Sequence, residues 1–195
     1  MELEADQIKS NIKFISKSLG FSDCRIAKVK PASHGDRFRE WIADGTAGDM
    51  KWLEKNVERR INPEEVLEGA KSMVCLALNY YPGEHDSEQN IDYKIARYAW
   101  NEDYHDIIDD KLRDLNFAME ELGGKQRFYV DTGPVLERDF ASDAGLGWNG
   151  SHRFSDPRCG FFPIRKIDCK KIDYELLKTQ PVFVALASVF PYIQD

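Results

Sequence analysis

The sequence has few cysteines, and no two of them lie close together. The four are Cys24, Cys75, Cys159 and Cys169. A ferredoxin-type iron–sulfur cluster is held by a closely spaced C-x-x-C-x-x-C run, so this spacing excludes a cluster of that pattern. Cys75 lies in an apolar run, where a buried free thiol is the ordinary interpretation. His34 has no second ligand at a metal-binding spacing, which favours a solvated histidine, and we predict no metal site.

Two further absences bear on location and partners. No apolar run is long enough to cross a bilayer, and the start carries no secretory signal, so we predict a cytoplasmic protein without a membrane partner. A strongly basic face is also missing: the net charge is −7 and the pI is about 5.2, a poor match for a protein that holds nucleic acid by its phosphates. The nearest basic cluster is Arg165, Lys166, Lys170 and Lys171, which is interpreted as solvated surface.

The residues that are present predict a globular chain of alternating helices and strands. Apolar residues make up 42% of the 195 residues, enough for one domain, or one domain with an appendage. Helical spacing is clearest over 2–20 and 108–122, and the apolar run 73–78 has no alternation, which predicts a strand covered on both faces. Asn62 and Pro63 are typical of a helix start. Spacing alone favours an α/β sandwich with a small central sheet.

The chemistry-bearing residues gather in the stretch from Tyr129 to Gly150. A strand ends near Val130, and Pro134 suits the first position of a helix that Gly145 would end. Asp131 therefore lies at the carboxyl end of a strand, close to a helix N-terminus, where α/β proteins often place functional groups. On residue type alone a plain capping aspartate is favoured here, because aspartate is common near a helix start and a catalytic aspartate is rare.

The charged and glycine residues that follow also have two interpretations. Glu137 and Arg138 are either pocket residues or a first-turn charge with a solvated partner. The glycines around Trp148 either let a cofactor approach or only stop a helix before a tight turn. Their spacing is not that of the dinucleotide-binding fingerprint, and no strand directly precedes them, so we reject a dinucleotide site.

The run VDTGPVLERDFASDAGLGWNG, residues 130–150, closely resembles the signature of the epoxyqueuosine reductases. These are cobalamin-dependent iron–sulfur enzymes that complete the queuosine base in tRNA. The segments RYA at 97–99 and DYH at 103–105 resemble a second element of the family, and residues 48–63 resemble a third more weakly. The resemblance covers roughly residues 1–150.

The resemblance implies an α+β, three-layer-like domain whose small central sheet is mixed or antiparallel and flanked by helices, as in nitroreductase-like cobalamin-processing proteins. It implies an oxidoreductase that reduces epoxyqueuosine in tRNA to queuosine, with cobalamin and iron–sulfur clusters. Cluster ligands are absent from this chain, which implies a separate electron donor. By this analogy Asp131 is the catalytic proton donor, and Glu137 and Arg138 bind substrate. The residues implied around the cofactor are Arg97, Tyr98, Tyr104, His105, Gly145, Gly147 and Trp148.

The sequence departs from the family pattern at Ser151. We therefore expect a cobalamin-binding domain over 1–150 and a divergent tail over 151–195, in a chain truncated or frame-shifted before the cluster domain. The apolar segment 182–192 is expected to form an edge strand or a short helix with low order. Two other functions remain open, a cobalamin-binding module without catalysis and an inactive remnant; a flavin enzyme is disfavoured because no basic cluster stands out for a phosphate.

Overall fold

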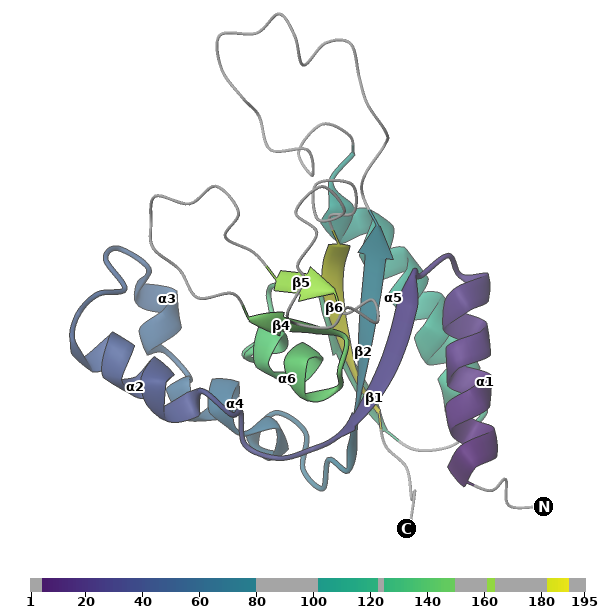
Figure 1. The fold of residues 1–195 in the computed structure, drawn as a ribbon, viewed down its shortest axis with the longest axis horizontal. Helices are drawn as coiled ribbons and strands as arrows, with labels where there is room; N and C mark the ends of the chain where they lie inside the picture. Colours follow the sequence, from purple (N-terminus) through teal and green to yellow (C-terminus); the bar gives the residue numbers. More distant parts are fainter. Residues whose placement is uncertain (1–4, 80–101, 123–124, 150–160, 164–181, 190–195) are drawn as a thin grey trace, which may run out of the picture.

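The computed structural model describes residues 5–79, 102–122, 125–149, 161–163 and 182–189. Its elements follow the chain from an N-terminal helix to a C-terminal strand (Figure 1). They are α1 (Ala5–Ser18), β1 (Asp23–Lys28), α2 (Gly35–Ala43), α3 (Lys51–Glu54), α4 (Val57–Ile61), η1 (Pro63–Glu65), β2 (Ser72–Asn79), α5 (Tyr104–Glu120), β3 (Gln126–Tyr129), α6 (Glu137–Asp143), β4 (Gly147–Asn149), β5 (Phe161–Pro163) and β6 (Val182–Val189).

The main sheet has four strands in the order β1-β2-β6-β3, and each neighbouring pair is antiparallel. The α+β class with a small antiparallel sheet is therefore confirmed, and the α/β sandwich suggested by spacing alone is wrong. Because β2 and β3 both run antiparallel to β6, they run in the same direction, and their carboxyl ends point toward the same end of the sheet. A separate ribbon pairs β4 with β5.

Helices cover both faces of the sheet, which produces three layers (Figure 1). On one face Val74 and Leu76 of β2 pack in a cluster with side chains from α1 and α5. On the other face Met73, Cys75 and Ala77 pack with side chains from α6. The strand predicted to be covered on both faces is confirmed, since its residues 73–77 are all buried.

Helix α5 supplies the longest buried stripe of the structure. Its buried residues keep a three-to-four spacing, so they share the face that packs against the sheet. Burying a side chain of this size contributes roughly 1.5–3 kcal/mol relative to leaving it exposed. The buried residues are Ile108, Leu112, Leu115 and Met119.

The position of β6 corrects the expectation for the tail. Val182–Val189 is neither an edge strand nor a helix, because it pairs with β2 on one side and β3 on the other. An uncharged apolar segment suits that interior position, where both of its backbone edges are hydrogen-bonded. The boundary at residue 150 and the frame shift stay predictions.

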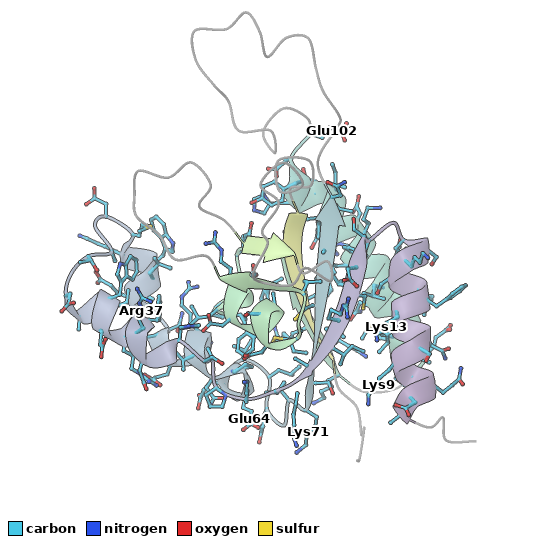
Figure 2. The ribbon with its side chains drawn as sticks, in the orientation of Figure 1. Lys9, Lys13, Arg37, Glu64, Lys71 and Glu102 are labelled. Carbon is cyan, nitrogen blue, oxygen red and sulfur yellow. The ribbon has the colours of Figure 1, made fainter. Side chains whose placement is uncertain are left out.

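The outer surface carries the charged side chains, and the basic ones are spread over distant elements. Lys9 and Lys13 project from α1, whereas Arg37 projects from α2 on the other side of the structure (Figure 2). Among the helices that the structure describes, none is both long and apolar enough to span a bilayer.

Candidate active site

Asp131 lies at the carboxyl end of β3 and adopts a left-handed backbone conformation with φ of 54°. Positive φ is uncommon for a residue with a side chain, and the strain is of order 1–3 kcal/mol. Helix α6 begins at Glu137, and its N-cap is Leu136, which makes no side-chain cap. The plain capping role for Asp131 is therefore excluded, and its exposed carboxylate is left available for other contacts.

Tyr104 provides the partner of Asp131 from the opposite side of the site. Its hydroxyl donates to Oδ2 of Asp131 at 2.6 Å. The tyrosine is the first residue of α5, whose start is fixed because the Asp103 carboxylate accepts a hydrogen bond from the His105 amide at 2.9 Å. The rings of Tyr104 and His105 are stacked with centroids 4.0 Å apart. Two segments that are separated by the whole of α5 thus meet at the edge where β3 ends.

The backbone amide and ring of His105 together hold the pKa of the Asp103 carboxyl below its usual range. The cap is therefore charged near neutral pH, where it complements the positive end of the α5 dipole.

Glu137 lies in the first turn of α6, and its carboxyl group is largely buried. Its Oε1 is buried and has no donor among the described residues. Burial raises the pKa of Glu137 well above its usual value, and the neighbouring Asp131 carboxylate raises it further. The site therefore combines an exposed carboxylate with a buried carboxyl that favours its neutral form.

Arg60, at the end of α4, holds the loop between Asp131 and α6. Its Nη1 donates to the Gly133 carbonyl at 3.3 Å, and its own carbonyl accepts from the Leu136 amide at 3.1 Å. Leu136 has a non-helical ψ of 74°, so α6 begins three residues later than the predicted start at Pro134. Burial lowers the pKa of Arg60, and the charge of Glu137 opposes that effect. The sequence offered only a weak motif match for this residue.

The other predicted site residues have different positions. Arg138 is exposed on α6, next to Glu137. Gly145 ends α6 with φ of 71°, as predicted, because a left-handed C-cap favours glycine. Gly147 is buried in β4, and the backbone of Trp148 pairs with that of Phe162. Arg97 and Tyr98 lie outside the described residues.

His34 is exposed, as expected for a solvated histidine, but it also contacts Asp139. The ring is 56% exposed, but its Nδ1 lies 2.9 Å from Oδ1 of Asp139, and its amide donates to Oδ2 at 2.8 Å. Ser33 and Lys30 contact Asp143 one turn further along α6. These contacts fix the loop ahead of α2 against the helix that carries Glu137. Over the described ranges, no group of three or more His, Cys, Asp or Glu side chains is arranged to hold a metal.

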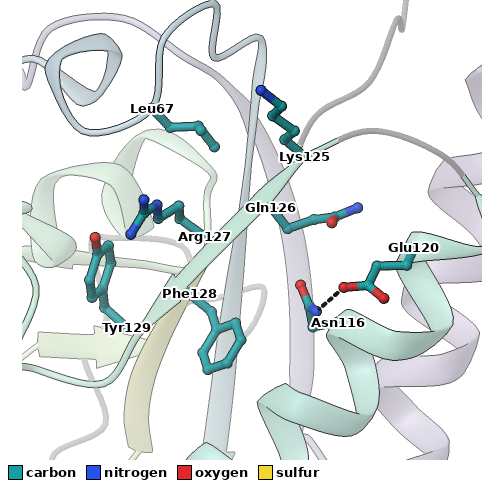
Figure 3. Close-up of a pocket in the computed structure, with 8 residues that line it drawn as sticks. All are labelled: Leu67, Asn116, Glu120, Lys125, Gln126, Arg127, Phe128 and Tyr129. Carbon is teal, nitrogen blue, oxygen red and sulfur yellow. Dashed lines mark hydrogen bonds between the residues drawn. The ribbon is translucent and has the colours of Figure 1, made fainter.

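A hollow of about 720 Å³ lies along β3 (Figure 3). Its walls come from β3, the end of α5 and the segment before β2, and Asn116 donates to Glu120 at 2.8 Å on one side. The lining residues are Leu67, Asn116, Glu120, Lys125, Gln126, Arg127, Phe128 and Tyr129. Because neither Tyr104 nor Glu137 lines it, this hollow is distinct from the candidate site.

Gly133 allows the loop that carries Asp131 to pass against Tyr129. A Cβ atom at position 133 would lie 2.4 Å from Cγ of Tyr129. We expect Gly133→Ala to shift the loop and to lower the free energy of unfolding by roughly 1–3 kcal/mol, the usual effect of overpacking. Urea denaturation of both proteins measures this change.

Gly69→Ala is a comparison variant with a different cause of strain, because Gly69 has positive φ and Gly133 does not. Gly69 has positive φ but no neighbour within 4 Å of an added Cβ, so its loss reports only backbone conformation. Equal unfolding midpoints for the Gly133 variant and the unmodified chain would contradict the close-approach account.

Fold and site together define an antiparallel α+β domain with paired carboxyl groups at one end of its sheet. The family model described as "Epoxyqueuosine reductase QueG, DUF1730" matches residues 60–132. The chain is 38% identical over 144 residues to an epoxyqueuosine reductase of Cyclobacterium marinum, covering 72% of this chain and 46% of that protein. It is 41% identical over 129 residues to an epoxyqueuosine reductase of Synechocystis sp., and this match covers 65% of this chain and 44% of that protein.

A solved structure of epoxyqueuosine reductase with an epoxyqueuosine-modified tRNA-Tyr stem loop has the same fold. It aligns with a TM-score of 0.70 at 22% identity, covering 93% of this chain and 45% of the other. The chain is therefore similar to the epoxyqueuosine reductases in sequence and in fold, and it spans about half the length of the curated relatives it matches.

Proposed function

We propose that this chain is the cobalamin-binding part of an epoxyqueuosine reductase, which reduces epoxyqueuosine in tRNA to queuosine. The observation that carries the proposal is the Asp131 carboxylate, held by Tyr104 at an exposed end of the sheet. It lies in the stretch whose sequence resembles the family signature. The substrate assignment draws on the tRNA stem loop bound to the structural neighbour. Because that substrate is a tRNA, we also propose a cytoplasmic location.

The described residues fit cobalamin at this end of the sheet. A corrin ring carries amide groups at its rim and needs hydrogen-bonding partners beside an open surface. Tyr104 and His105 offer polar aromatic rings at half-buried positions, and Asp131 is exposed between them and α6. We assign cofactor contacts to these residues, to Gly145 and Gly147, and to Arg97, Tyr98 and Trp148, whose side chains lie outside the described part.

The residues of the chain have three roles: they bind the cofactor, orient the substrate and protonate its leaving oxygen. Cobalamin, when bound, supplies electrons to the substrate. An oxygen that leaves carbon as an alkoxide needs a positioned acid, and Asp131 is assigned that role. The Tyr104 hydroxyl fixes the direction of its carboxylate, while Arg138 and Glu137 shape the pocket for the substrate.

Two components must come from elsewhere. The chain has no cluster-binding cysteine run, so a separate iron–sulfur donor delivers low-potential electrons. Its net charge of −7 leaves little general attraction for tRNA, so contacts at the modified base and a partner surface supply the affinity.

The test is an absorbance titration of the purified chain with cob(II)alamin, monitored for the change that marks release of the lower axial base. We expect saturable binding that weakens at least tenfold in Tyr104→Ala, because the variant loses both the ring and the Asp131 contact. Phe117→Ala, on the exposed side of α5, is the control and should bind normally. Binding without reduction of substrate would favour a non-catalytic cobalamin module, and no binding by the folded chain would leave an inactive remnant.

A further inference from the structure

The proposed reaction consumes more protons than one acid holds. Converting an epoxide into an alkene breaks two carbon–oxygen bonds, takes up two electrons and two protons, and releases water. Both protons end on the same oxygen, and a single carboxyl group that has given up the first must be protonated again before the second. The inference that follows rests on the proposed function and adds a residue to it.

Asp131 alone can supply only one of those protons at a time. Its side chain is exposed, and its Oδ2 accepts a hydrogen bond from the Tyr104 hydroxyl. Glu137 has the opposite surroundings, because its carboxyl group is largely buried and its Oε1 has no donor. Glu137 interacts with both the side chain and the backbone of Asp131, so the two carboxyl groups are neighbours. Two carboxyl groups in such contact share a proton, because two unscreened negative charges would repel.

We propose that Glu137 and Asp131 form a proton-sharing carboxyl pair in which Asp131 contacts the substrate and Glu137 reloads it. In the first step the electron supply reduces the epoxide, one carbon–oxygen bond breaks, and the oxygen takes a proton from Asp131. Glu137 then passes its proton to Asp131. In the second step the other carbon–oxygen bond breaks, and the leaving hydroxide takes that proton to become water. A one-electron iron–sulfur donor supplies both electrons, and solvent reprotonates the pair.

The charges around Glu137 decide how firmly it holds its proton. Burial favours the neutral acid, and so does the side chain of Asp131, which faces Glu137 from the loop after β3, whereas the backbone of Asp131 favours the carboxylate. Arg138 from α6 favours the carboxylate, and Arg60 from α4 interacts with it electrostatically. The Cys75 thiol of β2 is also affected by this carboxyl, and its own pKa is raised, chiefly by burial. Burial and the acidic partner outweigh the basic neighbours, so the pKa of Glu137 is raised well above its usual value.

The first experiment is a carbon-13 NMR titration of the chain labelled at its Asp and Glu carboxyl carbons, without any cofactor. The Glu137 resonance is the one lost in Glu137→Gln. We expect its midpoint to lie well above that of an ordinary glutamate, and to fall in Asp131→Asn because the neighbouring charge is removed. Glu64→Gln, at an exposed position, is the control and should leave that resonance unchanged. An ordinary midpoint that does not respond to Asp131→Asn would overturn the proposal.

Stability provides a second readout that does not depend on assigning resonances. A carboxyl group whose pKa is raised by folding binds protons more tightly in the folded chain, so its contribution to stability falls as pH rises from the usual value to the raised one. Glu137→Gln has no titrating carboxyl at this position, so it does not lose stability over this pH range. The difference between its urea midpoint and that of the unmodified chain should therefore increase as pH rises from the usual glutamate pKa to the raised one. A difference that stays constant with pH would contradict a titrating Glu137.

Kinetics separate reloading from simple substrate binding. Glu137→Gln should lower kcat by roughly tenfold or more, within the range for a general acid, with little change in KM. A change confined to KM would overturn reloading and leave a substrate contact. Because the NMR and stability measurements need no cobalamin, failure of the cofactor titration and failure of the carboxyl pair are distinguishable.

Discussion

Replacing Asp131 by asparagine is expected to abolish epoxide reduction while cobalamin affinity stays almost unchanged. Asparagine has nearly the same shape, tolerates the left-handed φ of 54° and keeps an oxygen for the Tyr104 hydroxyl. It cannot donate a carboxylic proton. Loss of a general acid lowers rates by roughly 10²–10⁴-fold, so turnover should fall by that factor.

The measurement is single-turnover reduction of an epoxyqueuosine-containing stem loop, with cobalamin and a low-potential chemical reductant as the electron source. Asp114→Asn, on an exposed part of α5, is the matched control and should react at the unmodified rate. A variant at position 131 that retained full activity would remove the acid role from this residue.

Among the buried side chains of the described residues, Phe140 is the one whose replacement by alanine should cost the most stability. The ring is fully buried between α6 and the sheet, in the cluster with Met73, Cys75 and Leu146. Removing a buried aromatic ring leaves a cavity, and the free energy of unfolding should fall by about 3–5 kcal/mol, a large part of the stability of a small domain. Because the end of α6 is followed by Gly145, to which we assign a cofactor contact, we also expect cobalamin affinity to fall.

Phe117→Ala is the control for that variant, since it removes the same ring from a position that is 68% exposed on α5. Its effect should stay within about 0.5 kcal/mol. Urea unfolding of the two proteins gives the comparison directly, and similar losses in both would mean that α6 is not packed as the structure shows.

Local elements of the fold could be predicted from the sequence, because burial leaves a periodic trace. The spacing of Ile108, Leu112, Leu115 and Met119 gave α5, and the unbroken apolar run gave β2 with both faces covered. The start of α6 was wrong by three residues, since Pro134 suits a helix start but Arg60 holds the loop in another conformation.

Contacts between residues that are distant in the sequence could not be predicted from a local pattern. Nothing local shows that the Tyr104 hydroxyl reaches Asp131, or that His34 contacts Asp139 across 105 residues. The resemblance to the family singled out Asp131, Tyr104 and Glu137, yet it said nothing of the buried carboxyl beside the exposed one. That difference depends on which side chain the packed layers enclose, which only the folded arrangement decides.

The place of β6 in the sheet also dictates when the site can form during synthesis. In the described sheet, β3 has β6 as its strand partner, and β6 ends at Val189. Strand β3, which leads to Asp131, can therefore be paired only after about sixty further residues have left the ribosome. Such long-range pairing raises contact order and slows folding. Until then β2 and β3 expose unpaired edges, so nascent chains of this protein are candidates for chaperone binding.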